Sequence, residues 1–195
     1  MNYQSIALFC GSSRGENPDF AADAVTFGRT MVQKGLTLYY GGGCIGLMGV
    51  VADAMMEQDG TVIGVAPDFF KMGPVLADNI TEMIYVKTMS ERKQLLEKRA
   101  DAFVIFPGGF GTMDELFEII TDAQLGLHKK PIVVYNAEGY YDHLKALLEH
   151  FTEEGFLREF HKDLVSFADT VEDIFQALDH YENTNSESWL SKIKH

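Results

Sequence analysis

The stretch that decides the fold is Phe103 to Glu118, which reads FVIFPGGFGTMDELFE. Four consecutive apolar residues at 103–106 predict a buried parallel strand, and Pro107 ends it. Three glycines follow, and an apolar periodic run from Leu116 indicates a helix. This order places unpaired N–H groups and the positive end of a helix dipole beside the turn. We therefore expect an anion, most simply a phosphate, to bind here.

The glycines of this turn are Gly108, Gly109 and Gly111. Without a Cβ atom they can adopt positive φ, and a ligand can approach their peptide N–H groups closely. The next two polar residues, Thr112 and Glu115, have two interpretations. As a Thr-x-x-Glu capping box they would only begin the helix. As functional groups, Thr112 would extend the phosphate cradle and Glu115 would face the ligand, and the spacing alone favours neither interpretation.

The alternation of strand and helix continues along the chain. Apolar strands are predicted at 5–10, 36–40, 61–66, 82–86, 103–106, 131–135 and 164–167, with helices between them and a last helix at 170–181. Such strands, separated by helices, indicate a parallel sheet that is covered on both faces. We therefore expect an α/β fold with an open, doubly wound, Rossmann-like parallel sheet.

This fold class predicts where a ligand binds. In doubly wound sheets, ligands bind beyond the carboxyl ends of the strands, where the strand order reverses. The turns at 11–15, 41–46 and 107–111 each follow a predicted strand and should rim one crevice. We expect residues 1–181 to form a single nucleotide-binding domain, followed by a polar C-terminal tail at 182–195.

The turn at 41–46 offers a rival function. Gly41, Gly43 and Gly46 satisfy the G-x-G-x-x-G pattern of dinucleotide-binding folds. However, this pattern follows the second strand rather than the first, and Asp59, at about the distance of a ribose-binding acid, falls at a helix end. Two glycine turns of similar quality favour one smaller phosphorylated ligand instead, such as a mononucleotide.

The helix predicted at 88–99 is a second source of chemistry. Arg92 lies one turn after Met89 on the same face, and the helix begins at the same edge of the sheet as the glycine turns. Arg92 could therefore project into the crevice. The alternative is that Arg92 and Lys93, with two later basic residues, form a solvated basic face.

The composition argues against several classes of protein. The formal net charge is −13 and basic residues do not cluster, so we expect no nucleic-acid binding. No apolar run approaches a membrane span and the N-terminus lacks a basic signal-peptide region, so we expect a cytoplasmic protein without membrane contact. Cys10 and Cys44 fit neither a zinc pattern nor a disulfide framework, and we expect no metal.

Together, these residues resemble a known family. The segment 107–115, PGGFGTMDE, matches the PGGxGTxxE signature of the Lonely-guy (LOG) family, and Arg92-Lys93 stands where that family has its Arg-Lys pair. The resemblance covers nearly the whole chain and includes GSS at 11–13, YGGG at 40–43 and GYYDHL at 139–144. It implies a phosphoribohydrolase that cleaves the N-glycosidic bond of a nucleoside 5′-monophosphate, which releases the free base and ribose 5-phosphate. Such proteins are often labelled lysine decarboxylases, but no lysine here has an evident context for pyridoxal phosphate, and we expect no cofactor.

The resemblance also implies roles for individual residues, with catalysis by Arg92 and Glu115. Departure of the base builds positive charge on the ribose, which a carboxylate can stabilise while it orients or deprotonates water. Arg92 would hold the ribose hydroxyls or the Glu115 carboxylate. Ser90 stands where plant relatives often carry His, so we expect a bacterial-type preference for AMP, with isopentenyl-AMP as a second substrate. The residues implied to bind substrate are Gly43, Met89, Lys93, Gly108, Gly109, Phe110, Gly111 and Thr112.

A homodimer is a further implication of the resemblance, with the second chain completing the site. Apolar side chains on and after the motif helix, Phe117, Ile120, Leu125 and Leu127, could pack against that partner. Alternatively, these side chains all face the protein's own sheet. Two other functions stay open, namely a nucleotide-binding module without turnover and a NAD-dependent enzyme that uses the turn at 41–46.

Overall fold

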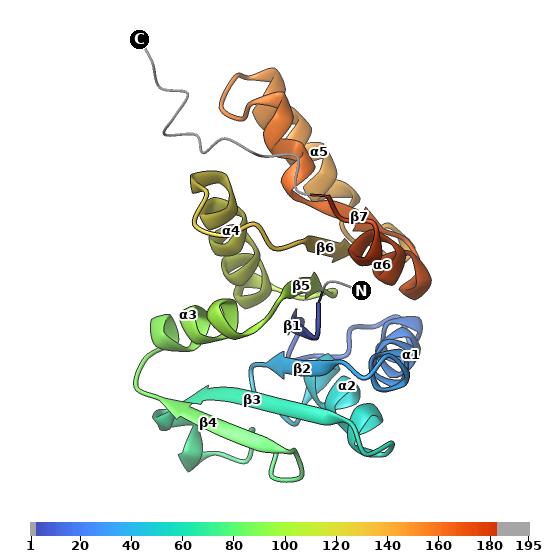
Figure 1. The fold of residues 1–195 in the computed structure, drawn as a ribbon, viewed down its shortest axis with the longest axis vertical. Helices are drawn as coiled ribbons and strands as arrows, with labels where there is room; N and C mark the ends of the chain where they lie inside the picture. Colours follow the sequence, from blue (N-terminus) through green and yellow to red (C-terminus); the bar gives the residue numbers. More distant parts are fainter. Residues whose placement is uncertain (1–2, 183–195) are drawn as a thin grey trace.

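The fold is built on one parallel sheet (Figure 1). The computed structural model describes residues 3–182, so the predicted tail at 182–195 lies almost wholly outside the described residues. The strands pair in the order β4-β3-β2-β1-β5-β6-β7. They are β1 (Ser5–Phe9), β2 (Thr37–Tyr40), β3 (Thr61–Pro67), β4 (Glu82–Val86), β5 (Ala102–Ile105), β6 (Ile132–Tyr135) and β7 (Ser166–Ala168). The expected open, doubly wound α/β sheet is confirmed.

Helices cover both faces of this sheet. Helices α1, α2 and α6 pack on one face, and α3, α4 and α5 pack on the other (Figure 1). The α-helices are α1 (Asp19–Gln33), α2 (Gly46–Met56), α3 (Met89–Arg99), α4 (Phe110–Leu125), α5 (Asp142–Glu153) and α6 (Val171–Asp179). Short 3-10 helices are η1 (Asp68–Met72), η2 (Ala137–Gly139) and η3 (Glu159–Leu164).

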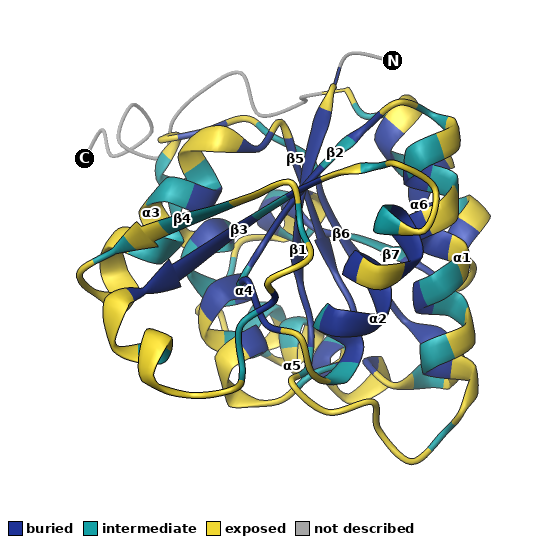
Figure 2. Ribbon diagram, turned by 90° about the horizontal axis from the view of Figure 1, so that it is seen from below, coloured by how far each residue is buried: buried dark blue, intermediate teal, exposed yellow. Residues whose placement is uncertain are grey.

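The continuous apolar strands of the sequence follow from this two-sided covering. In β1, Ile6 and Leu8 pack into the core on one face, whereas Ala7 and Phe9 pack into the core on the other. All four side chains are buried, so these positions are apolar on both faces of the sheet. Figure 2 shows the result, with buried strands at the centre and the exposed residues on the outer sides of the helices.

The strand order reverses between β1 and β5, which are neighbours in the sheet. β1 continues through α1 to β2 on one side, and β5 continues through α4 to β6 on the other. Backbone hydrogen bonds hold the loops at this point together. The Gly11 N–H donates to the Pro107 carbonyl (2.9 Å), and the Leu47 N–H at the start of α2 donates to the Gly11 carbonyl (3.1 Å). The sheet thus brings its glycine turns to one edge.

Helix α4 begins earlier than the sequence predicts, because it follows β5 with hardly any loop. Its N-cap is Gly109, and its first backbone bond runs from the Met113 N–H to the Gly109 carbonyl (3.0 Å). Thr112 and Glu115 therefore both lie inside the helix, and the capping-box interpretation is wrong. The expected positive φ is wrong as well, because the positive-φ glycines among residues 3–182 do not include Gly108, Gly109 or Gly111.

Candidate active site

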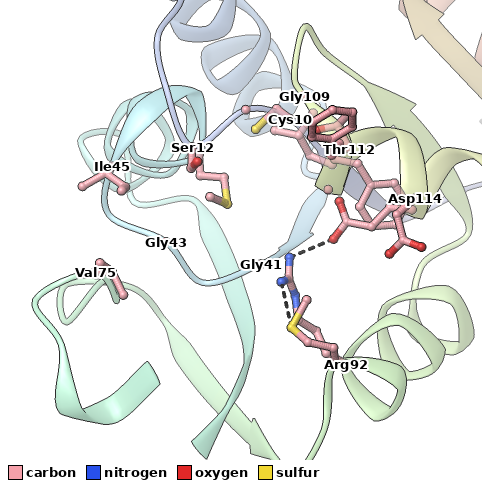
Figure 3. Close-up of a pocket in the computed structure, with 18 of the residues that line it drawn as sticks. Cys10, Ser12, Gly41, Gly43, Ile45, Val75, Arg92, Gly109, Thr112 and Asp114 are labelled. Atoms are coloured by element: carbon pink, nitrogen blue, oxygen red, sulfur yellow. Dashed lines mark hydrogen bonds and ion pairs between the residues drawn. The ribbon is translucent and has the colours of Figure 1, made fainter. Parts of the chain in front are cut away.

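A cavity of about 430 Å³ opens at the carboxyl ends of the central strands, where the strand order reverses. All three glycine turns contribute to it, as expected (Figure 3). Gly11 and Ser12 come from the turn after β1, Gly41 and Gly43 from the turn after β2, and residues 109–112 from the start of α4. The cavity therefore lies where doubly wound folds bind their ligands.

The floor of the cavity carries an ion pair between two helices. Arg92 Nη2 of α3 lies 2.8 Å from Glu115 Oε1 of α4, and the two side chains are only 12% and 8% exposed. The solvated basic face is thus the wrong interpretation for Arg92. Helix α3 presents Arg92 in its first turn because Thr88 fixes the helix start, where its hydroxyl accepts a hydrogen bond from the Glu91 N–H (3.1 Å).

Glu115 is held in an unusual protonation state for a carboxyl group. Burial raises its pKa from an ordinary 4.5 to about 7, and the Arg92 guanidinium limits the rise. The carboxyl group therefore exchanges its proton near neutral pH, where it can act both as a carboxylate and as a proton carrier. A carboxyl group with such a pKa in a cavity is typical of catalytic sites.

Arg92 retains donor groups that the protein does not satisfy. Its Nη1 lies 3.7 Å from Met89 Sδ, which is a weak acceptor, and confirms that the two residues share a helix face. Its Nε is buried and has no hydrogen-bond partner among residues 3–182. Because buried donors in proteins are normally satisfied, these nitrogens are available to hydroxyl or anionic oxygens of a ligand.

The start of α4 supplies an anion-binding surface. The first N–H groups of the helix, at 110–112, have no acceptor within the helix. Gly109 and Gly111 are open around the missing side chain, since, apart from the adjoining backbone, no atom of residues 3–182 lies within 4 Å of the place that a Cβ atom would take. Arg92 is the one basic side chain among the described residues that line the cavity. An anion here would therefore be bound mainly by backbone N–H groups and the helix dipole.

Two residues implied to bind substrate do not line this cavity. Lys93 does not line the cavity and instead forms ion pairs with Asp114 (3.0 Å) and Glu118, both on α4. Gly108 is packed inside the turn, where a Cβ atom would lie 2.1 Å from Thr112 Oγ1 and 2.9 Å from the Gly11 nitrogen. The other implied residues, Gly43, Met89, Gly109, Phe110, Gly111 and Thr112, line the cavity with Arg92 and Glu115.

The G-x-G-x-x-G pattern has a structural explanation that involves no dinucleotide. Gly46 has a φ of +64°, and a Cβ atom on it would lie 2.2 Å from the backbone of Ser12. This glycine is thus needed for contact between two turns of the protein. Asp59 stands between α2 and β3, at the amino-terminal edge of the sheet and away from the cavity. The acid that would hold the ribose of NAD is therefore in the wrong place.

Sequence reasoning missed one wall of the cavity. The segment 68–78, between β3 and β4, contributes Phe70, Val75 and Leu76, and it is tied to the second turn by an antiparallel bridge between Gly43 and Leu76. Ile45 and Met48 extend this apolar surface. The available signal was the presence of apolar residues in a segment without helical or strand periodicity, because apolar side chains in a loop are often buried against another part of the protein.

Comparison with known proteins identifies the family. The family described as "Possible lysine decarboxylase" matches residues 48–178. The probable cytokinin riboside 5′-monophosphate phosphoribohydrolase LOG6 of Arabidopsis thaliana is 38% identical over 92% of this chain and 89% of its own length. The probable phosphoribohydrolase LOG4 of Oryza sativa subsp. japonica is 40% identical over 90% of this chain and 76% of its own. This chain belongs to the LOG family.

The residues that line the cavity fit the LOG activity better than they fit a lysine decarboxylase. No lysine within residues 3–182 lines the cavity, so the residues there offer no amine to carry pyridoxal phosphate. The LOG signature residues, in contrast, surround it: the glycine turn, Glu115 and Arg92.

Solved structures share the fold at lower identity. The molybdenum cofactor binding protein of Rippkaea orientalis superposes with a TM-score of 0.69 at 18% identity, and covers 92% of this chain and 97% of its own. The molybdenum cofactor carrier protein of Chlamydomonas reinhardtii superposes with a TM-score of 0.66 at 21% identity, and covers 90% and 95%. These likenesses confirm the LOG chain's architecture alone. Separately, no helix of residues 3–182 is long and apolar enough to cross a membrane.

Proposed function

We propose that this LOG protein is a phosphoribohydrolase that cleaves the N-glycosidic bond of nucleoside 5′-monophosphates. The observation that carries the proposal is the buried Arg92–Glu115 pair at the floor of a cavity rimmed by glycine turns. Both LOG relatives named above bear the same activity in their names. The products are the free base and ribose 5-phosphate.

Glu115 acts on the ribose in this proposal. As the bond between the anomeric carbon and the base nitrogen breaks, its electron pair leaves with the base and the ribose ring becomes positively charged. The Glu115 carboxylate stabilises this charge and takes a proton from the attacking water. The water oxygen bonds to the anomeric carbon, and a proton is returned to the departing base nitrogen. A pKa near 7 suits a group that must both accept and release this proton.

Arg92 and the glycine turns hold the substrate. Arg92 keeps Glu115 in place through Nη2, and its unsatisfied Nε is free to donate to a ribose hydroxyl. The phosphate binds at the start of α4, where Gly109, Gly111 and Thr112 border the cavity. Gly43, Met89 and Phe110 border it as well and complete the substrate-binding set that we propose. We propose that Lys93 and Gly108 support the site without contacting the substrate. Lys93 joins α3 to α4 through its ion pair with Asp114, and Gly108 packs against Thr112.

The apolar wall of the cavity receives the base. Ile45, Met48, Phe70, Val75 and Leu76 present a surface suited to a flat purine and to an apolar substituent on it. Both AMP and isopentenyl-AMP fit such a surface, and we propose AMP as the first substrate because Ser90 stands where plant relatives often carry His. Incubation with a panel of nucleoside monophosphates, followed by chromatography of the released bases, ranks them directly.

The decisive experiment compares AMP with adenosine. The two compounds share the scissile bond, so any difference in rate measures what the remote phosphate contributes. We expect steady release of adenine from AMP and very slow release from adenosine, because the phosphate orients the ribose over Glu115. Equal rates would show that the turns do not bind a phosphate.

The same protein and ligands distinguish the proposed hydrolase from the two rival functions. A nucleotide-binding module without turnover would be stabilised against heat by AMP but would release no adenine. A NAD-dependent enzyme would be stabilised by NAD rather than by AMP and ribose 5-phosphate. The position of Asp59 favours neither NAD binding nor a dinucleotide site.

We further propose that the protein is a homodimer and acts in the cytoplasm. Phe117 and Ile120 on α4 line a second apolar hollow with Leu148, Phe151 and Phe156 of the α5 region, which we term the α4–α5 groove. Leu127, just after α4, is 69% exposed. These side chains do not all face the protein's own sheet, which supports their packing against a partner.

A further inference from the structure

Gly41 lies beside the catalytic pair rather than beside the expected phosphate site. A Cβ atom on Gly41 would lie 2.2 Å from Arg92 Nη2 and 3.0 Å from Arg92 Cζ. Both separations are shorter than van der Waals contact allows. The Arg92 guanidinium thus occupies the space that any side chain at position 41 would need, as Figure 3 shows.

We propose that Gly41 is a positioning residue, whose missing side chain leaves the passage through which Arg92 reaches Glu115. The geometry supports this independently of any substrate, and only its effect on turnover rests on the proposed function. Nη2, the atom that would be displaced, is the same atom that bonds Glu115 at 2.8 Å.

Gly41 differs in this respect from the other glycines of its turn. Gly42 has a φ of +76°, Gly43 would meet the end of the Met48 side chain at 2.9 Å, and Gly46 would meet the Ser12 backbone. Gly41 is not among the positive-φ glycines of residues 3–182, so an alanine can adopt its backbone conformation. Its nearest contacts are the ends of two flexible side chains, Arg92 and Met48. A Gly41→Ala protein should therefore fold and move Arg92 instead.

Displacement of Arg92 has a defined electrostatic consequence. Glu115 faces Arg92 and Lys93 from α3, Asp114 and Glu118 from its own helix, and the buried Cys10 thiol after β1. Arg92 is the largest of the influences that lower the pKa of Glu115. Without it, only Lys93 still opposes burial and the neighbouring acids, and the pKa of Glu115 rises further.

The experiment is a direct titration of Glu115 by carbon NMR of protein labelled at the glutamate carboxyl carbons. The Glu115→Gln variant identifies the resonance. In Gly41→Ala we expect the midpoint to move upward by about one pH unit or more, as loss of a contacting opposite charge requires. The matched control is Gly73→Ala, because a Cβ atom there would come no closer than 4.0 Å to any neighbour. Its titration should equal that of the wild type.

Turnover of AMP provides the second measurement. We expect the acid limb of the pH profile to move with the NMR midpoint in Gly41→Ala. The rate at pH 7 should fall about fivefold, because a one-unit shift from a pKa of about 7 lowers the ionised fraction from about one half to about one eleventh. In an Arg92→Ala background, Gly41→Ala should change neither the titration nor the residual rate, since the group through which it acts is gone.

Three results would overturn the proposal. One is an unchanged Glu115 midpoint in Gly41→Ala. Another is an equal loss of rate from Gly41→Ala in the presence and absence of Arg92. The third is failure of Gly41→Ala to fold even in the Arg92→Ala background, because position 41 would then be limited by something other than the guanidinium. If the wild type cleaves no nucleotide, the proposed function fails, whereas the NMR titration still decides the role of Gly41.

Discussion

At the scale of single residues, Glu115 is the group on which the proposed chemistry depends. Glu115→Gln preserves size and hydrogen bonding but cannot carry charge. Because Glu115 does not cap its helix, the substitution should not disturb the start of α4. We expect turnover of AMP to fall by on the order of a hundredfold or more, with AMP still raising the melting temperature. Near-normal turnover in the variant would remove Glu115 from the mechanism.

The raised pKa of Glu115 also predicts a dependence of stability on pH. Its value in the folded protein, about 7, exceeds the ordinary 4.5. The folded state therefore binds the proton more tightly than the unfolded state, and this contribution to stability is complete below pH 4.5 and lost as the pH rises through 7. Glu115→Gln carries no such proton. Relative to the wild type, its free energy of unfolding should rise by roughly 2 to 3 kcal/mol between pH 5 and pH 8.

Chemical denaturation at both pH values measures this difference. Comparison of the two proteins at each pH cancels the other ionisable groups, because the substitution leaves them in place. A difference that does not change with pH would mean that Glu115 has an ordinary pKa in the folded protein.

Gly109 tests the phosphate site at the same scale. The free protein has room for a side chain there, but the Gly109 backbone has φ −102° and ψ −145°, which a β-branched residue rarely adopts. Gly109→Ala is therefore the variant that should fold with a modest loss of stability. The added side chain would occupy the space where the phosphate is expected. We expect loss of AMP cleavage and loss of thermal stabilisation by ribose 5-phosphate, with a melting temperature of the free protein that falls by only a few degrees. Normal stabilisation by ribose 5-phosphate would place the phosphate elsewhere.

At the scale of elements, the glycine turn before α4 is held from outside by two tyrosines at the start of α5. The Tyr141 hydroxyl donates to the Phe106 carbonyl and the Tyr140 hydroxyl to the Gly108 carbonyl, each at 2.8 Å. Asn136, at the end of β6, fixes this start by accepting a hydrogen bond from the Tyr141 N–H (2.7 Å). The turn that rims the cavity is therefore braced by the element that follows β6.

Removal of the Tyr140 hydroxyl bond should affect AMP binding more than it affects the stability of the protein. Tyr140 is 44% exposed, so Tyr140→Phe should cost less than about 1 kcal/mol of stability. We expect the KM for AMP to rise several-fold while the small activity on adenosine stays unchanged, because in the proposed complex the phosphate is the part of the substrate that lies against the braced turn. Equal effects on both substrates would point to a general loosening of the site. Lys145→Ala, on the same helix but away from the turn, serves as the control.

The elements themselves could be predicted from the sequence, because the physics that forms them is local. The seven strands and their glycine turns show as apolar runs with breaks, and the turn positions then follow from the parallel order. The start of α4 at Phe110 could not be predicted, because Thr112 and Glu115 have the spacing of a capping box. The pairing of Glu115 with Arg92 could not be predicted either, because it depends on how the sheet places α3 beside α4. The apolar wall at 68–78 was missed for the same reason, because its burial depends on a bridge to Gly43 that is distant in sequence.

At the scale of the whole molecule, the proposed homodimer can be tested by substitution of an exposed apolar residue. We expect sedimentation at micromolar concentration to show a dimer. Leu127→Glu, which places a charge on an exposed apolar position just after α4, should shift it toward monomer. Met72→Glu is the matched control, because Met72 is 94% exposed on η1, outside the α4–α5 groove. A wild-type protein that sediments as a stable monomer would contradict the proposal.

The contact between Gly41 and Arg92 also constrains the evolutionary history of such a protein. A lineage that keeps the arginine can fill position 41 only by displacing Arg92 from Glu115, whereas a lineage that has lost the arginine no longer needs the glycine. We therefore expect the arginine to leave first, with a larger residue at position 41 following. Descendants that have given up hydrolysis and only carry a nucleotide should bear both changes together. Joint replacement of the residues at positions 41 and 92 would therefore distinguish nucleotide carriers from hydrolases in genome sequences before either kind of protein is purified.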